Sequence, residues 1–301
     1  MDVYLPIANL SVNGLWIVAL GGLTGVLSGL FGVGGGFLTT PLLIFYGIPP
    51  TVAAASASTQ VTGASVTGVL AHGKRGGVDY RMGLVMVAGG VIGSGVGALL
   101  FRFFRSIGQI DVVINALYVI LLGSIGMLMA REAVQAIRGT GSTQAARRRH
   151  HPLVASLPMR WRFYRSGLYI SPIAPLLVGV AVGILTMLMG VGGGFILVPA
   201  MLYILGMSAN VVVGTSLYNI LFVTMASTIM HSLTTKAVDI VLVFLLLLGS
   251  VSGAQIGSQI AVKAKPEILR LILATIVLLV AFRMFLGLFY QPDEIYTVYP
   301  L

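Results

Sequence analysis

Two glycine clusters could carry chemistry in this chain, because each would expose backbone N–H groups directly before a short helix. Residues 32–41 read GVGGGFLTTP and residues 190–199 read GVGGGFILVP, so the two stretches agree at seven of ten positions. The first N–H groups of a helix lack partners within it, and the helix dipole places about half a positive charge there. Each cluster therefore predicts an anion site that needs no arginine. The predicted binding residues are Gly34, Gly35, Gly36 and Phe37 in the first cluster and Gly192, Gly193, Gly194 and Phe195 in the second.

A structural alternative applies to both clusters. Glycines also let helices cross closely, which is common in membranes. For one cluster the two interpretations would be balanced. Two matched clusters, each opening a short helix, favour the anion site.

Neutral polar side chains follow each cluster on the next expected helix. In residues 51–72 Ser56 and Gln60 share one helical face, flanked by Ser58 and Thr59. The matching segment 209–231 carries Thr215, Ser216 and Asn219 at the equivalent turn. Hydroxyls and amides suit a ligand whose charge is already balanced by helix ends. The alternative is hydrogen bonding between helices, worth about 0.6 kcal/mol for each bond.

The titratable residues restrict the chemistry further. His72 and His231 occupy equivalent positions and are candidates for a proton relay, or else lie at the headgroup boundary. All eight acidic residues fall at segment ends or in loops, so a cation would find no buried counter-charge. Without cysteine or a Walker motif, the sequence predicts no catalytic residue, no metal site and no cofactor.

The composition identifies the class of protein. Of 301 residues, 57% are apolar and 9% are charged, with a mean hydropathy of +1.01, whereas soluble domains carry about 25% charged residues. The chain therefore belongs in a lipid bilayer, and its long apolar runs predict helices. The first span lacks a basic leader and is expected to be retained. The net charge of +10 is attributed to cytoplasmic loops rather than to nucleic-acid binding.

The glycine clusters belong to a longer internal repeat. After the two clusters, Gln60 matches Asn219 and His72 matches His231 at an offset of 159, and Asp79 matches Asp239 at 160. Such order predicts a duplicated unit. The expected parts are a first transmembrane repeat over residues 1–138, a basic linker over 139–168 and a second repeat over 169–301.

Each half contains one element that is too short to cross the bilayer. Residues 36–46 would form a helix of roughly 17 Å, while the hydrocarbon core is about 30 Å thick. The element is therefore half of a broken helix or one arm of a re-entrant hairpin, enclosed by protein. We expect an all-α, polytopic protein whose two duplicated halves contain five segments each: 14–31, 36–46, 51–72, 80–101 and 110–130, then 170–189, 194–205, 209–231, 238–261 and 267–289.

The basic residues bear on how the halves are oriented. Inverted repeats would place 14 of the 18 basic residues on the cytoplasmic side, and parallel repeats would place 13 there. Both arrangements put the linker in the cytoplasm, and the difference does not decide between them. Inverted repeats are preferred by analogy with other transporters that contain broken helices. In either case the segment 160-RWRFYR-165 reads as an interfacial anchor.

Two further glycine series have a purely structural interpretation. Gly89, Gly93 and Gly97 recur at every fourth position, as do Gly249, Gly253 and Gly257. Small residues at this spacing form a face for close helix packing in membranes.

The glycine stretches also resemble a known family, the TauE/SafE permeases (sulfite exporters and their relatives). The motif GxGGGxxxxP runs from Gly32 to Pro41 and again from Gly190 to Pro199. The second half carries Gly214–Thr215–Ser216, a triplet typical of the family, whereas the first half departs from it with Ala55–Ser56–Ala57. The resemblance covers nearly the whole chain except the linker and tails. It implies secondary transport of small sulfur-containing anions such as sulfite, thiosulfate, sulfoacetate and other organosulfonates.

The sequence as a whole predicts a multi-pass inner-membrane permease that moves a small anion by alternating access. The main alternative is a passive anion channel that uses the same helix ends. A scaffold without a ligand is disfavoured by the buried Gln and Asn. The identity of the anion, the direction of transport, a coupled proton or sodium ion, and a homodimer stay open.

Overall fold

The computed structural model describes residues 2–31, 34–74, 76–137, 161–263 and 266–289. The elements of the first half are β1 (Asp2–Leu5), β2 (Leu10–Asn13), α1 (Gly14–Phe31), α2 (Gly36–Phe45), α3 (Pro50–Lys74), α4 (Tyr80–Ser106) and α5 (Ile110–Ile137). Those of the second are β3 (Trp161–Phe163), β4 (Leu168–Ile170), α7 (Ile173–Met189), α8 (Gly194–Pro199), the π-helical turn η1 (Ala200–Ile204), α9 (Ala209–Thr234), α10 (Ile240–Lys263) and α11 (Pro266–Phe289).

The described part of the chain confirms an all-α polytopic membrane protein. Five of its helices are long and apolar enough to cross a membrane: Tyr80–Ser106, Ile110–Gln135, Val211–Thr234, Ile240–Gly257 and Leu271–Leu288. Helix α3 is also long, with 25 residues. It is not among the five, because its middle carries serine, threonine and glutamine side chains that lower its hydropathy. Such a helix requires protein rather than lipid around it.

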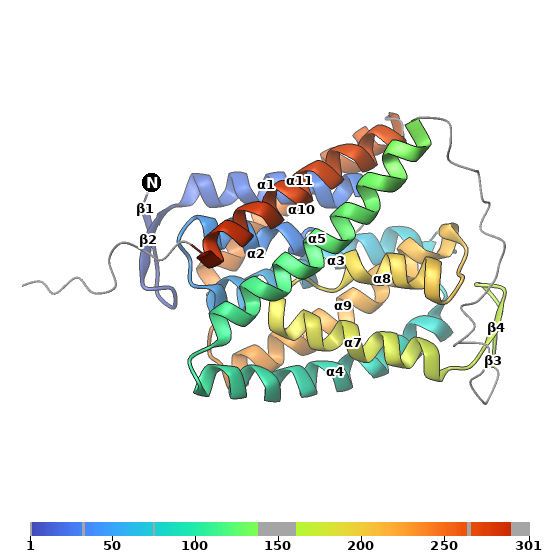
Figure 1. Ribbon diagram of the computed structural model, residues 1–301, viewed down its shortest axis with the longest axis horizontal. Helices are drawn as coiled ribbons and strands as arrows, with labels where there is room; N and C mark the ends of the chain where they lie inside the picture. The colour runs from blue at the N-terminus through green and yellow to red at the C-terminus, as the bar shows by residue number, and fades with distance from the viewer. Residues whose placement is uncertain (1, 32–33, 75, 138–160, 264–265, 290–301) are drawn as a thin grey trace, which may run out of the picture.

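Six helices lie in a row that takes its members alternately from the first and the second half. Helix α1 packs along α10, α10 contacts α3, α3 packs on α9, α9 contacts α4, and α4 packs along α7. Since α1 and α4 of the first half correspond to α7 and α10 of the second, each long contact has a counterpart in the other half. The pair α5 and α11 crosses one face of this row (Figure 1).

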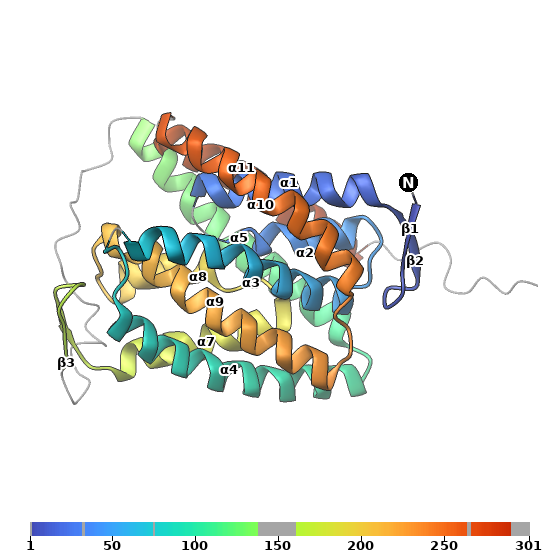
Figure 2. The ribbon, with the colours of Figure 1, turned by 180° about the vertical axis from the view of Figure 1, so that it is seen from behind.

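The halves are inverted relative to each other. Each begins with a β-hairpin, β1–β2 or β3–β4. The two hairpins lie at opposite ends of the helices in both views (Figures 1 and 2). A two-fold axis that relates the halves must therefore run across the helices, in the plane of a membrane that they span. This arrangement agrees with the preferred prediction of inverted rather than parallel repeats.

The hairpins were not predicted, and β3–β4 lies in the region where the sequence indicated a linker ending at residue 168. Each hairpin is held by a buried aspartate of the other half. The Asp79 carboxylate accepts hydrogen bonds from the Ser166 N–H at 3.0 Å and the Ser166 hydroxyl at 2.6 Å. The Asp239 carboxylate accepts one from the Ile7 N–H at 3.0 Å. Both carboxylates also accept N–H groups in the first turn of α4 or α10, so they act as helix caps as well.

The glycine series are confirmed as close-packing faces. A Cβ atom on Gly93 would lie 2.1 Å from the Val180 carbonyl oxygen of α7. On Gly253, in the symmetric contact, it would lie 2.2 Å from the Gly22 carbonyl oxygen of α1. Because these neighbours are backbone atoms, no side-chain adjustment can make room. The close packing of α4 on α7 and of α10 on α1 therefore requires glycine at these positions, because its side chain is a single hydrogen atom.

We predict that Gly93→Ala lowers the free energy of unfolding by about 1–3 kcal/mol, because the methyl group forces α4 away from α7. Gly95→Ala is the matched control on the same helix, since nothing lies within 4 Å of its added Cβ. The control should be neutral or up to about 1 kcal/mol more stable, owing to the higher helix propensity of alanine. Thermal unfolding in detergent measures both. Equal stability of the two variants would show that the pair tolerates separation.

Candidate anion site at the broken helices

The first helix of each half breaks at its glycine cluster. Helix α1 ends at Phe31 and α2 begins at Gly36, while α7 ends at Met189 and α8 begins at Gly194. These starts agree with the expected segments, which begin at residues 36 and 194. The cluster of the first half begins with Gly32 and Val33, and these two residues lie outside the described residues.

The second break depends on a backbone conformation that favours glycine. Gly190, Gly192 and Gly193 have φ values of 72°, 73° and 73°, in the left-handed region that other residues rarely adopt. Gly190 also has no space for a side chain, because a Cβ would lie 2.1 Å from the Ala54 carbonyl oxygen. The second break therefore requires glycine for two reasons: the left-handed backbone conformation and the close contact of Gly190 with α3.

Helix α8 is shorter than predicted. The segment 194–205 was expected to be one helix, but the α-helix ends at Pro199 and continues as the π-helical turn η1. Proline lacks the N–H group of the α-helical ladder, and its ring disturbs the preceding turn. Pro41 occupies the equivalent place in α2, which nevertheless stays α-helical to Phe45. The two half-helices thus differ in shape.

Both breaks meet at the middle of α3 and α9. A Cβ on Gly36 would lie 2.5 Å from a Val61 methyl group, and one on Gly192 would lie 2.7 Å from the other Val61 methyl group. Ile220, which is equivalent to Val61, approaches Gly34 and Gly192. The stacked rings of Phe37 and Phe195, with centroids 4.7 Å apart, join the two half-helices directly. The structure therefore brings the two predicted glycine sites together.

Gln60 and Asn219, which precede Val61 and Ile220, carry the polar character of this region. They are 1% and 0% exposed. The side-chain oxygen of Gln60 and both polar atoms of the Asn219 amide have no hydrogen-bond partner. A buried amide without a partner costs about 1–3 kcal/mol by mutational measures. Unpartnered amide atoms at equivalent positions of both halves indicate groups reserved for a ligand or for water.

The other predicted polar residues have partners within the protein. Ser58 donates to the Thr224 carbonyl oxygen at 3.4 Å, and Thr59 pairs with Thr228 at 3.2 Å. Ser216 donates to the Val213 carbonyl oxygen at 2.9 Å. These bonds either join α3 to α9 or stay within one helix, as the structural alternative for hydroxyls expects.

Ser56 and Thr215 have a symmetric structural task. The Ser56 hydroxyl oxygen accepts the Asp239 N–H at 3.2 Å, and the Thr215 hydroxyl oxygen accepts the Asp79 N–H at 3.0 Å. The Ser56 hydroxyl thus anchors the start of α10 to α3, and the Thr215 hydroxyl anchors the start of α4 to α9, each across the two halves. A role in reading the oxygens of a ligand stays a prediction for both residues.

Sequence reasoning missed Thr186, whose hydroxyl is also buried without a partner. This hydroxyl would lie 3.1 Å from a Cβ on Gly193, so it sits against the second glycine cluster. The repeat offset was the available signal, because it aligns Thr186 with Ser28, and Ser28 lies against Gly35 in the same way. A hydroxyl therefore accompanies each cluster.

Of the two histidines predicted as a proton relay, only His231 has a described side chain. His231 is fully buried, where one ring nitrogen lies 3.0 Å from the Met187 carbonyl oxygen and the ring packs edge-on against Phe101. Its side chain is enclosed by protein at whatever depth it lies, so the headgroup alternative stays open beside the relay. The relay stays a prediction. The His72 side chain lies outside the described residues.

The two buried aspartates already have structural partners. Asp79 and Asp239 cap helices, and within the described ranges no group of three His, Cys, Asp or Glu residues could hold a metal ion. The region around the breaks therefore offers helix N-termini, amides and hydroxyls. This combination suits a small anion.

Comparison with known proteins identifies relatives across almost the full chain. The family described as Sulfite exporter TauE/SafE matches residues 17–284. The probable membrane transporter protein YjnA of Bacillus subtilis (strain 168) is 27% identical over 265 residues, which are 87% of this chain and 96% of that protein. A probable membrane transporter protein of Xylella fastidiosa (strain Temecula1) is 28% identical over 268 residues, or 88% and 92% of the two chains.

A plant relative matches a shorter region. The Sulfite exporter TauE/SafE family protein 3 of Arabidopsis thaliana is 34% identical over 115 residues, which are 35% of this chain and 24% of that protein. No solved structure matches the chain.

We predict that Thr215→Val lowers the free energy of unfolding by about 1–3 kcal/mol, because it leaves the buried Asp79 N–H without an acceptor. Thr215→Ser keeps the hydroxyl and should stay within about 1 kcal/mol of the parent. Denaturant titration of the two variants in detergent measures the difference. If valine and serine unfold at the same denaturant concentration, this hydrogen bond does not anchor α4.

Proposed function

The chain belongs to the Sulfite exporter TauE/SafE family and is a multi-pass membrane transporter, and we propose that it carries a small anion by alternating access. The anion is a sulfur oxyanion or an organosulfonate, with sulfite, thiosulfate and sulfoacetate as the leading candidates. The proposed location is the inner membrane, with the linker in the cytoplasm. Coupling to a proton or sodium ion and assembly as a homodimer stay predictions.

The observation that carries this proposal is the pair of unpartnered amides beside two helix breaks. Gln60 and Asn219 are equivalent in the repeat and buried, and the Gln60 side-chain oxygen and both polar atoms of the Asn219 amide have no hydrogen-bond partner. A sulfonate or sulfite group presents several oxygen acceptors, to which the unpartnered NH₂ group of Asn219 and the helix N-termini would donate. The unpartnered oxygen of Gln60 would accept from a protonated ligand or from water. The negative charge of such a group would be stabilised by the half-helix dipoles.

The closed surroundings of the site support a carrier. With Gln60 and Asn219 at 1% and 0% exposure, this conformation gives solvent no open route to the amides. Inverted repeats provide two equivalent ways to open, since a motion available to one half at one end is available to the other half at the opposite end. The states need differ by only a few kcal/mol for ligand binding to shift the balance between them.

We predict that the double variant Gln60→Leu/Asn219→Leu loses anion uptake in proteoliposomes while its folding is preserved. Leucine removes the amides that would bind the anion, and it also removes buried polar atoms that lack partners, so the melting temperature should stay equal or rise. Gln109→Leu, at an exposed position between α4 and α5, is the matched control and should transport normally. Uptake by the double variant at the parent's rate would refute the site.

We predict counterflow for a reconstituted carrier: unlabelled sulfite inside the vesicles should accelerate entry of labelled sulfite, and the rate should saturate. Alternating access produces this exchange because the loaded carrier returns with substrate bound. A passive channel, the second candidate, would instead give a flux that rises linearly with concentration, without acceleration from the other side. A linear flux would therefore contradict the carrier hypothesis and favour the channel.

A further inference from the structure

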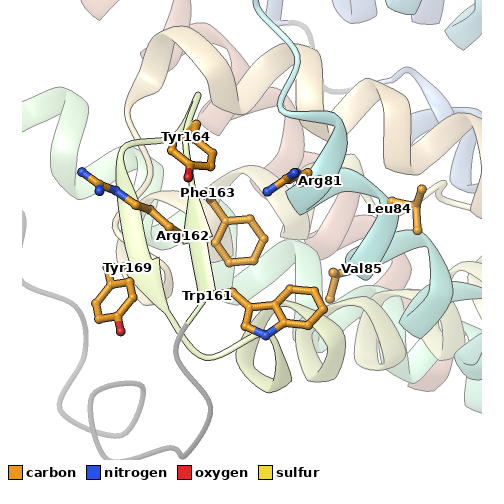
Figure 3. A pocket seen from close by; sticks show the side chains of 8 residues that line it. All are labelled: Arg81, Leu84, Val85, Trp161, Arg162, Phe163, Tyr164 and Tyr169. Carbon is orange, nitrogen blue, oxygen red and sulfur yellow. The ribbon is translucent and has the colours of Figure 1, made fainter.

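A second polar site lies at the surface, between the β3–β4 hairpin and the start of α4. Figure 3 shows Trp161 and Phe163 of the hairpin pointing toward α4, whereas Arg162 and Tyr169 extend to the other side of the hairpin. A hollow at this place has a volume of about 510 Å³, and its lining includes Arg81 and Leu84 of α4 together with Trp161, Arg162 and Tyr164 of the hairpin. Phe163 is 1% exposed and forms an apolar floor.

Two arginines flank one aromatic ring at the edge of this hollow (Figure 3). The guanidinium groups of Arg81 and Arg162 each lie 5.7 Å from the centre of the Tyr164 ring. Neither arginine has a carboxylate partner in the part of the chain that the structure describes. The adjoining sequence 139–160 contains no acidic residue that could supply one. Two positive charges without a carboxylate partner make this end of the molecule attractive to an anionic group.

The nearest carboxylate is already engaged. Asp79 lies two residues before Arg81, but its oxygens accept hydrogen bonds from Met82 and Ser166, and it is 3% exposed. Arg165, on the same hairpin, donates instead to the Gly76 and Val78 carbonyl oxygens. Arg165 thus has a structural role, whereas Arg81 and Arg162 are available to a ligand.

The hollow continues onto a face of α4 that is suited to an acyl chain. Leu84 lies one turn after Arg81 and is 61% exposed, and Ile92 and Leu99 follow farther along the same helix with 57% and 67% exposed. Because α4 is one of the apolar spanning helices, these side chains face lipid tails. Trp161, Tyr164 and Tyr169 are exposed at the helix end, where aromatic residues sit at the level of the headgroups. The site therefore combines a charged end with an apolar track.

The inverted repeat supplies an internal comparison. The repeat offsets pair Arg81 with Val241, Arg162 with Tyr4, and Tyr164 with Pro6, so the equivalent surface at the β1–β2 end has neither arginine. A purely structural feature of the hairpin would be expected at both ends. Of these equivalent positions, the arginines occupy those at the end where the linker joins, which is the end predicted to face the cytoplasm.

We propose that this hollow binds the phosphate headgroup of an anionic phospholipid, with the acyl chain lying along α4. Arg81 binds the phosphate oxygens, Arg162 adds a second positive charge beside Tyr164, and the aromatic side chains of the hairpin position the headgroup. Such a lipid would join the hairpin to α4 at one end of the molecule. This site is separate from the proposed transport site, and its lipid does not depend on which anion is carried.

The test uses the full-length protein in mixed micelles that contain equal amounts of phosphatidylglycerol and phosphatidylcholine, with retained lipid counted by native mass spectrometry. Each arginine near an anionic lipid favours it by about fivefold, so the parent should retain phosphatidylglycerol at least about fivefold over phosphatidylcholine. Arg81→Gln/Arg162→Gln should retain the two lipids equally, while Arg81→Lys/Arg162→Lys should keep a preference. Lys74→Gln removes an exposed charge outside the hollow and should behave as the parent.

Three results would overturn the proposal. The parent could show no preference between the lipids, or the glutamine double variant could keep the full preference at an unchanged melting temperature in phosphatidylcholine. Excess inorganic phosphate provides the third comparison. If phosphate alone displaces phosphatidylglycerol from the parent and raises its melting temperature equally, the hollow binds a free anion rather than a lipid.

Discussion

Irregular backbone inside a membrane must be enclosed by protein, and this constraint determines most of the architecture. The breaks between α1 and α2 and between α7 and α8 expose backbone groups that hydrocarbon cannot satisfy. The polar helices α3 and α9 lie against both breaks, and α5 and α11 cross over the row that contains them. The glycine contacts of α4 with α7 and of α10 with α1 complete the enclosure. The features proposed to bind an anion are thus the ones that the fold must protect from lipid.

The alternation of helices from the two halves also indicates which parts could move together. Each long glycine-packed pair contains one helix from each half, so α1–α10 and α4–α7 are expected to behave as units rather than the halves themselves. The hairpins tie the ends of these units through Asp79 and Asp239. The symmetry is incomplete at the breaks. The Met189 carbonyl oxygen accepts hydrogen bonds from Thr40 and Tyr118, while Val198, the equivalent of Thr40, offers no donor. Such differences give the two half-helices unequal attachments.

Much of the fold could be predicted because a repeated pattern carries information twice. The ten expected segments correspond to the observed helices, and the glycine series were correctly interpreted as packing faces. The hairpins were missed because each strand has only three or four residues, too few for a clear alternation. The π-helical turn was missed because the same proline position gives an α-helix in one half and a break in the other. Partners of individual hydroxyls, such as Ser56 with Asp239, depend on contacts 183 residues apart that no local pattern encodes.

The most direct measurement of the central claim is the thermal unfolding of detergent-purified protein with different anions at equal ionic strength. A ligand that binds only the folded protein adds about 2.7 kcal/mol at 100 times its dissociation constant. The account predicts such stabilisation by sulfite, thiosulfate or sulfoacetate, and none by phosphate, nitrate or chloride. If all of these anions gave the same curve, the unpartnered amides and the broken helices would not form a site for a sulfur oxyanion.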